Sequence, residues 1–214
     1  MKLMKNLILI DDHKMLRKGI SSYFTENSDW TIFAEAETLD EVPAIIKKAE
    51  TQNDDLKSFV AVVDIQIKGE NQELLNGFCA IKILSEHRIP SVVFSSHDSG
   101  ACIERAMSHE VGARGFVSKL SDEKILLDAV NTVLNGQTFI QPDLVSSLLE
   151  VNTIYSVLTR REMEVLKLIQ DGLSNQEIAN LMKIKLSTLE NYLCIIYDKT
   201  GSRDKASLLE KIMW

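Results

Sequence analysis

The sequence has no apolar run of about 18 residues, the length that a membrane-spanning helix requires. Its opening, MKLMKNLILIDDH, is basic and then apolar, but the apolar stretch ends after five residues at two aspartates. This pattern is more typical of a buried strand than of a signal peptide. We therefore expect a cytoplasmic protein that has no membrane partner.

Cysteine is scarce, and the three residues present (Cys79, Cys102 and Cys194) do not have the spacing of a metal site. They are predicted to be small core residues in a reducing compartment. Internal repeats and low-complexity tracts are also absent. The 214 residues, 45% hydrophobic and 26% charged, are sufficient for one large globular domain or two ordinary ones.

Positive charge is in short supply, since the net charge is −7. Residues 153–214 hold nine Lys or Arg and eight Asp or Glu, a balance of about +1, which leaves about −8 for residues 1–152. The acidic front half suits a cation site. The back half gives only weak electrostatic support for nucleic-acid binding.

The front half alternates between short apolar runs and helix-like segments. The runs are rich in β-branched and aromatic residues, as strands are: NLILI, TIFAEA, FVAVVDI, SVVFSS and GFVS. Helices are predicted over 14–26, 39–50, 73–87, 101–110 and 122–135, and TLDE has the spacing of a capping box. This alternation predicts an α/β fold with a five-stranded parallel sheet, flavodoxin-like, covered on both faces.

The back half is predicted to be all helical. Gly136 and Pro142 break the alternation, so residues 1–135 form the first predicted domain, 136–156 a linker with a short helix over 143–151, and 157–214 the second domain. Four helices are expected there, at about 159–171, 174–182, 187–199 and 204–213. Three of them begin with capping-box spacing, TRRE, SNQE and STLE, in which a hydroxyl and a glutamate cap each other's backbone.

Five polar residues fall at predicted strand ends: Asp11, Asp12, Asp64, Ser95 and Lys119. Parallel strands carry their carboxyl ends to one edge of a sheet, where ligands bind in open α/β folds. Three crowded carboxylates need a cation, and their hard oxygens suit Mg²⁺ together with a phosphate. With a lysine and a hydroxyl opposite, the set predicts an aspartate that accepts a phosphoryl group. Each residue alone is more commonly a turn, a cap or a solvated charge.

The stretches LILIDDHKMLRKGI, VVDIQI, PSVVFSSH and GARGFVSKL resemble the receiver domain of bacterial two-component response regulators, and DDH…R.G is similar to the NarL/FixJ subfamily. The resemblance covers about residues 5–135. It implies that Asp64 is the phosphoacceptor and that Asp12 and Asp64 bind Mg²⁺ directly, with Asp11 acting through water and Gln66 through its backbone carbonyl. It further implies that Ser95 and Lys119 contact the phosphoryl group and that Phe116 repositions during the switch; a plain core role for Phe116 is compatible.

One departure from the receiver pattern lies after the phosphoacceptor. Lys68 stands where receivers usually have proline, and the matching glycine is Gly77, so KGENQELLNG is about five residues longer than usual. The added length could alter phosphoryl lifetime or partner access, or it could be a tolerated surface insertion.

Residues 157–210 resemble the LuxR-type helix-turn-helix that follows the receiver in NarL/FixJ regulators, most clearly in LTRREMEVLKLIQDGLSNQEIA. SNQEIANLMKIKLSTLENYL independently has two capped helices joined by a three-residue turn. Seven residues are candidates for phosphate or base contacts: Lys183, Lys185, Ser187, Thr188, Asn191, Lys199 and Arg203. A solvated helix face explains the lysines and the arginine equally well.

The resemblance is weaker in the second of these helices, where Glu190, Tyr192 and Ile195 replace the family's Lys, His and Asn. STLE spacing offers a structural reason for Glu190, as a capping partner of Ser187. Because basic contacts to phosphate supply most of the affinity for duplex DNA, weak binding is expected. The apolar run 193–197 must either pack against the last helix or be exposed, where it would suit a protein contact or thymine methyls.

The resemblance implies a response regulator that is not a classical enzyme. A sensor histidine kinase would phosphorylate Asp64, and the active state would dimerise and bind promoter half-sites on duplex DNA. Two alternatives stay open. In one, the helical domain binds a protein partner instead of DNA; in the other, the chain is a Mg²⁺-dependent enzyme of the phosphatase type.

Overall fold

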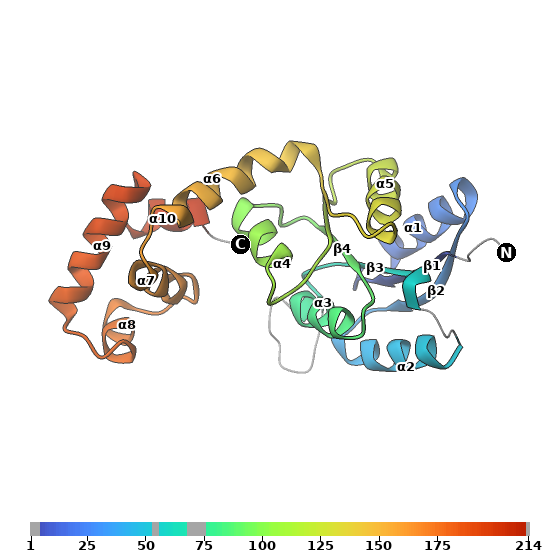
Figure 1. The fold of residues 1–214 in the computed structure, drawn as a ribbon, viewed down its shortest axis with the longest axis horizontal. Coiled ribbons are helices and arrows are strands. Elements are labelled where there is room, and N and C mark those ends of the chain that lie inside the picture. The colour runs from blue at the N-terminus through green and yellow to red at the C-terminus, as the bar shows by residue number, and fades with distance from the viewer. Residues whose placement is uncertain (1–4, 53–55, 68–75, 213–214) are drawn as a thin grey trace. The chain divides into compact units, whose positions relative to one another are not determined.

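The computed structural model describes residues 5–52, 56–67 and 76–212 (Figure 1). The chain divides into two compact units. The first contains residues 1–98 and 105–143, and the second contains residues 99–104 and 144–214. Within the described ranges, no helix has both the length and the apolar character needed to cross a membrane.

The first unit is built on a parallel sheet in the order β2-β1-β3-β4-β5-β6. Its strands are β1 (Lys5–Ile10), β2 (Trp30–Ala36), β3 (Phe59–Val63), β4 (Ser91–Ser95), β5 (Gly115–Ser118) and β6 (Phe139–Ile140). β3, β4 and β5 are buried along their whole length, which accounts for their continuous apolar sequences. The α/β parallel fold expected from the sequence is confirmed.

Helices cover both faces of this sheet. They are α1 (Lys14–Asn27), α2 (Val42–Gln52), α3 (Asn76–Glu86) and α5 (Glu123–Leu134), while the residues of α4 (Gly100–Met107) are divided between the two units. Successive strand residues point to opposite faces, so Leu7 and Leu9 join a core with Phe24 of α1 and Leu126 of α5. α2 and α3 lie on the other side of the sheet (Figure 1).

The sheet has six strands, and the sequence-based expectation of five was one short. β6 has two residues, which fell inside the predicted linker. Its backbone completes the edge of β5, because Phe139 N–H donates to Arg114 O over 3.0 Å and Gln141 N–H donates to Phe116 O over 3.0 Å. Two residues are too few to show a strand period, so this strand was not detectable from the pattern.

The second unit is helical apart from its connections. Its helices are α6 (Val145–Ser156), α7 (Arg160–Gln170), α8 (Asn175–Leu181), α9 (Leu186–Thr200) and α10 (Lys205–Ile212). α7, α8, α9 and α10 enclose a core that includes Leu166, Ile178, Leu193 and Leu208. Helix α6 runs to Ser156 and is longer than the expected linker helix.

Two of the three expected capping boxes in this unit are present, at Thr159–Glu162 and Ser174–Glu177. The third, at Ser187–Glu190, is absent: α9 begins one residue before Ser187, and its N-cap is Lys185, which makes no side-chain cap. The turn closes on backbone alone, since Leu189 N–H donates to Lys185 O over 3.1 Å. Glu190 therefore has no capping role.

The cysteines do not share one environment. Cys102 is buried, whereas Cys79 on α3 and Cys194 on α9 are exposed, so the expectation of three core cysteines was wrong for two of them. Both exposed residues lie on the outer faces of amphipathic helices, whose inner faces carry residues such as Ile81 and Leu193.

Candidate functional site

The polar residues expected at strand ends meet at one edge of the sheet. Asp11 follows β1, Asp64 follows β3, Ser95 ends β4 and Lys119 follows β5. Backbone bonds hold these ends together: Asp64 N–H donates to Ile10 O over 2.8 Å, and Lys119 N–H donates to Ser95 O over 2.9 Å. The parallel register of β1, β3, β4 and β5 thus places side chains that are distant in sequence around one point.

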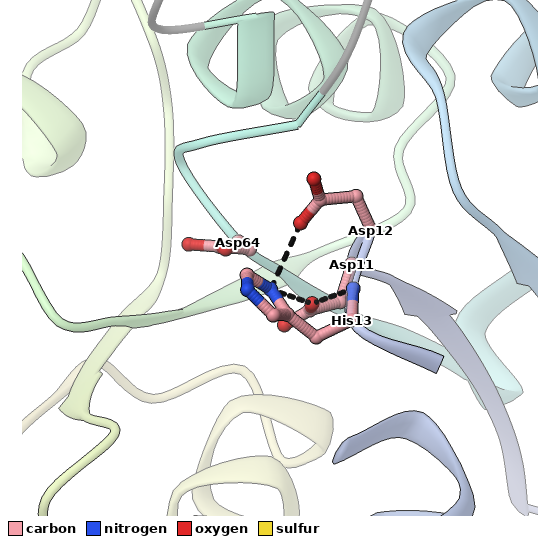
Figure 2. A group of neighbouring side chains, drawn as sticks. All are labelled: Asp11, Asp12, His13 and Asp64. Carbon is pink, nitrogen blue, oxygen red and sulfur yellow. Dashed lines mark hydrogen bonds and ion pairs between the residues drawn. The ribbon is translucent and has the colours of Figure 1, made fainter. Parts of the chain in front are cut away.

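Three carboxylates and one imidazole converge there. Asp11, Asp12, His13 and Asp64 each offer a ligand atom, and these atoms all lie within 4.8 Å of one another (Figure 2). His13 N–H donates to Asp11 Oδ1 over 2.7 Å, and its ring Nδ1 lies 2.8 Å from Asp12 Oδ1. His13 was not singled out by sequence reasoning, although it is part of the quoted DDH motif.

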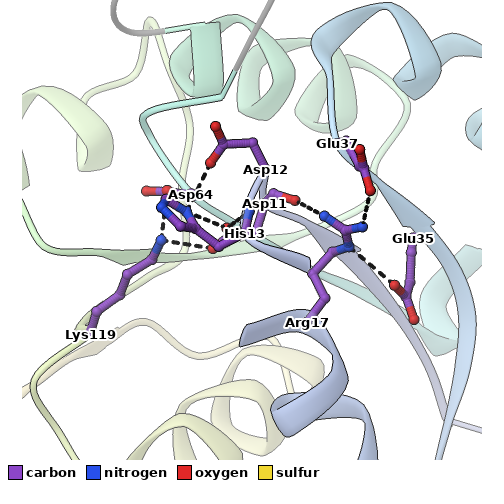
Figure 3. Close-up of polar contacts among 8 residues, drawn as sticks. All are labelled: Asp11, Asp12, His13, Arg17, Glu35, Glu37, Asp64 and Lys119. Atoms are coloured by element: carbon purple, nitrogen blue, oxygen red, sulfur yellow. Dashed lines mark hydrogen bonds and ion pairs between the residues drawn. The ribbon is translucent and has the colours of Figure 1, made fainter. Parts of the chain in front are cut away.

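Lys119 bridges two of the carboxylates. Its Nζ lies 2.7 Å from Asp11 Oδ2 and 2.6 Å from Asp64 Oδ2 (Figure 3). Burial lowers the pKa of Lys119, but the hydrogen bonds and charges of Asp11 and Asp64 outweigh burial, and the net pKa is raised. Lys119 is therefore a fixed cation beside the oxygen atoms of Asp64.

The donor set fits a hard divalent cation. Carboxylate oxygens are the ligands that Mg²⁺ prefers, and two of the three carboxyl groups are almost fully buried while the Asp12 side chain keeps 18% of its surface exposed. A cation could therefore enter the site from the side of Asp12 and keep some of its water ligands there. Gln66 is exposed beside the site, and its Nε2 lies 3.4 Å from His97 Nε2.

Ser95 and Phe116 are both fully buried. Ser95 Oγ accepts a hydrogen bond from His97 N–H over 3.2 Å, which orders the loop after β4. Ser118, which the sequence did not single out, ties the same loop to β5, because its hydroxyl donates to Asp98 Oδ2 over 2.7 Å. The two loops that flank Lys119 and Ser95 are thereby linked.

Gly77 lies against the backbone of the phosphoacceptor candidate. Its N–H donates to Ile65 O over 2.9 Å, and a Cβ at this position would lie 2.1 Å from Asp64 O. Close backbone approach therefore requires glycine at this position. The longer segment expected before Gly77 falls mostly on residues 68–75, outside the described residues.

In the second unit, α8 and α9 form the expected pair of packed helices. Leu189, Leu193 and Ile196 of α9 are buried in the core. The opposite face of α9 is exposed and carries Ser187, Thr188, Glu190, Asn191, Cys194, Ile195 and Asp198. The chain reaches this face through a turn in which Lys183 has a φ of 56°.

The basic candidates differ in what they contact. Lys183, Lys185 and Arg203 are exposed. Lys199 is also exposed, but it is paired: its Nζ lies 2.7 Å from Oε2 of Glu162, whose side chain is 6% exposed. Glu162 Oε2 also accepts from Thr159 N–H over 2.7 Å, so Lys199 is held by the cap of α7.

This ion pair predicts a pH dependence of the helical unit. The hydrogen bond from Lys199 lowers the pKa of Glu162, burial opposes it, and the bonds from Thr159 add to the lowering. A carboxyl group with a lower pKa in the folded state stabilises fully above about pH 4.5, its ordinary value, and loses that contribution as the pH falls through the folded pKa. We expect Glu162→Gln to cost roughly 1–3 kcal/mol at pH 7 and to cost progressively less below pH 4.5.

Hydrogen exchange of peptides from α7 and α9, followed by mass spectrometry at several pH values, measures this effect on the full chain. Arg161→Gln is the matched control, since Arg161 forms an exposed ion pair with Glu164 on the same helix. An equal cost of Glu162→Gln at pH 7 and below pH 4 would contradict the assigned role.

The first unit is a parallel α/β domain with acidic residues at its strand ends, and a helix-turn-helix unit follows it. This combination is that of a response regulator, with a receiver domain followed by a helix-turn-helix domain. The family model described as response regulator receiver domain matches residues 7–131, and the model described as bacterial regulatory proteins, luxR family, matches residues 156–211. The chain belongs to the response regulators that carry a LuxR-type helix-turn-helix, the NarL/FixJ type.

Known response regulators are similar to this chain over nearly its whole length. The response regulator protein VraR of Staphylococcus aureus is 28% identical over 203 residues, covering 93% of this chain and 91% of VraR. A structure of the two-component response regulator RcsB with DNA is 20% identical, with a TM-score of 0.67 over 97% of both chains. RcsB from Salmonella enterica serovar Typhimurium, bound to promoter rprA with the phosphomimetic BeF3−, is 23% identical, with a TM-score of 0.67 over 97% of this chain and 98% of RcsB.

Proposed function

We propose that this protein is a cytoplasmic transcription regulator that a sensor histidine kinase phosphorylates on Asp64. The observation that carries the proposal is the pair of contacts from Lys119 to Asp11 and Asp64, beside the carboxylate of Asp12. This arrangement combines a buried nucleophile, a fixed cation and an oxygen ligand set at the edge of a sheet. Membership of the response regulator family supports the proposal.

The residues of the site divide the chemistry among them. A carboxylate oxygen of Asp64 attacks phosphorus, the bond from phosphorus to the donor histidine nitrogen breaks, and the imidazole takes up a proton as it leaves. Asp11, Asp12, Asp64 and the carbonyl of Gln66 would hold Mg²⁺, which neutralises charge on the transferred group when bound. Lys119 then contacts a phosphoryl oxygen in place of its bond to Asp64.

Ser95 and Phe116 would carry the signal from the site. The hydroxyl oxygen of Ser95 now accepts from His97 N–H, and a phosphoryl group on Asp64 would offer the Ser95 O–H a charged acceptor. When Ser95 turns toward Asp64, the loop after β4 loses one of its bonds and Phe116 can reposition. Phosphorylation thereby shifts the population toward an active state.

The helical unit is proposed to bind duplex DNA through α9. Its exposed face offers Ser187, Thr188 and Asn191 for base edges and phosphates, while Lys183, Lys185 and Arg203 supply positive charge. Lys199 is largely committed to Glu162, so its contribution to DNA is secondary. RcsB, which shares the fold, has been solved with DNA, and this supports the proposal.

The active protein is proposed to be a homodimer that places two copies of α9 on half-sites about one helical turn apart. The receiver would comprise residues 1–135, the linker 136–156 and the DNA-binding domain 157–214. Dimerisation would compensate for the weak positive charge of each helical domain, because binding at the first half-site makes binding at the second intramolecular and raises the overall affinity.

An alternative function is favoured by the exposed apolar side chains of the helical unit. Leu181 is 62% exposed, Leu186 is 40% exposed and Ile195 is 43% exposed. With Glu190 on the same helix as Ile195, these residues would suit a protein partner of the helical domain in place of DNA.

Glu190 gives a direct test of the electrostatic part of DNA binding. We expect Glu190→Lys to tighten binding to duplex DNA by roughly tenfold at low salt, because it removes repulsion and adds a phosphate contact. The slope of log K against log salt should become steeper by about 1. Fluorescence anisotropy at several salt concentrations measures both quantities.

Glu164→Lys is the control for Glu190→Lys, because it makes the same change in net charge at an exposed position on α7, a different helix of the same unit. Equal tightening by both variants would show that only net charge matters and that α9 does not face the DNA.

The phosphoacceptor is tested by treating the full-length protein with a small phosphodonor and Mg²⁺, followed by intact mass and peptide mapping. The proposal predicts a single phosphoryl group on the peptide that contains Asp64. Modification confined to another residue, or no modification, would overturn it.

A further inference from the structure

Arg17 is a buried cation on the first turns of α1, and only 4% of its surface is exposed. Its guanidinium contacts three groups in two strand ends (Figure 3). Nη1 donates to the backbone carbonyl of Asp11, Nη2 donates to Glu37 Oε1, and Nε donates to Glu35 Oε2 over 3.1 Å. The proposed phosphoryl chemistry does not use this side chain.

Arg17 contacts the carbonyl of Asp11 at a position just beyond the end of strand β1. Asp11 N–H still donates to Ala36 O over 3.1 Å, but Asp11 lies beyond the last residue of β1. Asp11 is 4% exposed, so its carbonyl is largely withdrawn from water and needs a donor. Arg17 supplies that donor.

The side chain of Asp11 is held from the opposite direction. Its Oδ1 accepts from His13 N–H over 2.7 Å, and its Oδ2 lies 2.7 Å from Lys119 Nζ. With Arg17 on its carbonyl, Asp11 is fixed at both the backbone and the carboxylate. Asp11 in turn fixes the start of the loop that carries Asp12.

The two glutamates give the arrangement its charge balance. Without its own counter-charges, an arginine this close to three carboxylates would weaken their electrostatic attraction for a divalent cation. Glu35 and Glu37 compensate the charge of Arg17, and they tie it to the end of β2 and the residue just beyond it. The rigid fork of the guanidinium can serve three acceptors at once, which a lysine ammonium cannot do in the same geometry.

We propose that Arg17, held by Glu35 and Glu37, is a positioning residue that sets the Asp11–Asp12 loop for Mg²⁺. This role deepens the proposed function and rests on it. Outer residues that orient the ligands of a metal commonly change its affinity by about 10- to 100-fold when they are replaced. Arg17 would act through Asp11 and would contact neither Mg²⁺ nor the phosphoryl group.

The test is isothermal titration of the full-length protein with Mg²⁺, at a temperature where circular dichroism shows every variant to be folded. Arg17→Lys keeps the charge and loses the fork, and Arg17→Gln loses the charge and keeps one donor group. Lys5→Ala is the matched control: Lys5 lies 2.9 Å from Asp29 Oδ1 and 3.3 Å from Asn131 Oδ1, at the opposite end of β1.

We expect Arg17→Lys and Arg17→Gln each to weaken Mg²⁺ binding by about tenfold or more, and Lys5→Ala to leave it unchanged. Wild-type affinity in both Arg17 variants would overturn the positioning role while leaving the proposed function intact, even if their melting temperatures fall. Equal weakening by Lys5→Ala would also overturn it, because general destabilisation would then explain the loss. Failure of the wild type itself to bind Mg²⁺ would overturn the proposed function and this inference together.

Discussion

Replacing Asp64 by asparagine is expected to abolish covalent phosphorylation, with a loss in rate of roughly three orders of magnitude or more. The amide is neutral and a poor nucleophile, whereas the carboxylate of Asp64 lies 2.6 Å from the cation of Lys119 and is 4% exposed. The change also removes one of the charges that would hold Mg²⁺. Time courses of intact mass after addition of a small phosphodonor measure the effect.

The variant should remain folded, because Lys119 keeps its contact with Asp11 and the amide keeps the shape of the side chain. Asp40→Asn makes the same chemical change at an exposed position in the same unit and should be phosphorylated like the wild type. Phosphate uptake by Asp64→Asn at the wild-type rate would show that another residue is the acceptor.

The second large effect is expected at Gly77, where alanine should destabilise the receiver unit by about 3 kcal/mol or more. The added Cβ would lie 2.1 Å from Asp64 O and 2.5 Å from Ile65 Cα, and both are backbone atoms that cannot turn aside. Relief requires α3 to move away from the end of β3, which displaces Asp64. Urea unfolding of the full chain, followed by circular dichroism, gives the loss in stability.

Gly19→Ala is the matched control for this effect. Gly19 lies within α1, and a Cβ there would meet nothing within 4 Å. Alanine should therefore stabilise this exposed helical position by roughly 0.5–1 kcal/mol. If the two substitutions shift stability in the same direction and by similar amounts, the close approach at Gly77 has no energetic consequence.

The parts of the fold and site that follow from regular patterns could be predicted from the sequence. β3 is a continuous apolar run and β4 and β5 have apolar centres, and the residues that follow β3 and β5, Asp64 and Lys119, are polar. Parallel topology then brings the strand ends together without further information. The positions of Asp11, Asp64, Ser95 and Lys119 were predictable for this reason.

Features that depend on tertiary contacts were not predictable. Lys199 has the sequence context of a DNA contact, but the buried carboxylate of Glu162 holds its Nζ at 2.7 Å. The contacts of Arg17 join α1 to the ends of two strands, and no spacing within the sequence specifies such a link. Local propensity likewise suggested a cap at Ser187, whereas α9 begins on the backbone of Lys185.

The absence of a capping box at Ser187 has a functional consequence for Glu190. Without a capping bond, its carboxylate is exposed on the same face of α9 as Asn191. A negative charge on that face opposes phosphate binding, so DNA binding as proposed would depend on dimerisation or on direct base contacts. Phosphorylation that promotes dimerisation would then have a large effect on DNA affinity.

Phosphorylation of Asp64 is proposed to control binding of the helical domain to DNA. The most direct measurement is a mobility-shift selection of fragments from the genome that encodes the protein, with and without phosphodonor, at low and at moderate salt. We expect phosphorylated wild type to bind a small set of fragments with higher affinity than unphosphorylated protein or Asp64→Asn, and we expect that binding to weaken with salt. Failure of the phosphorylated protein to bind any fragment at low salt would contradict the claim and favour a protein partner.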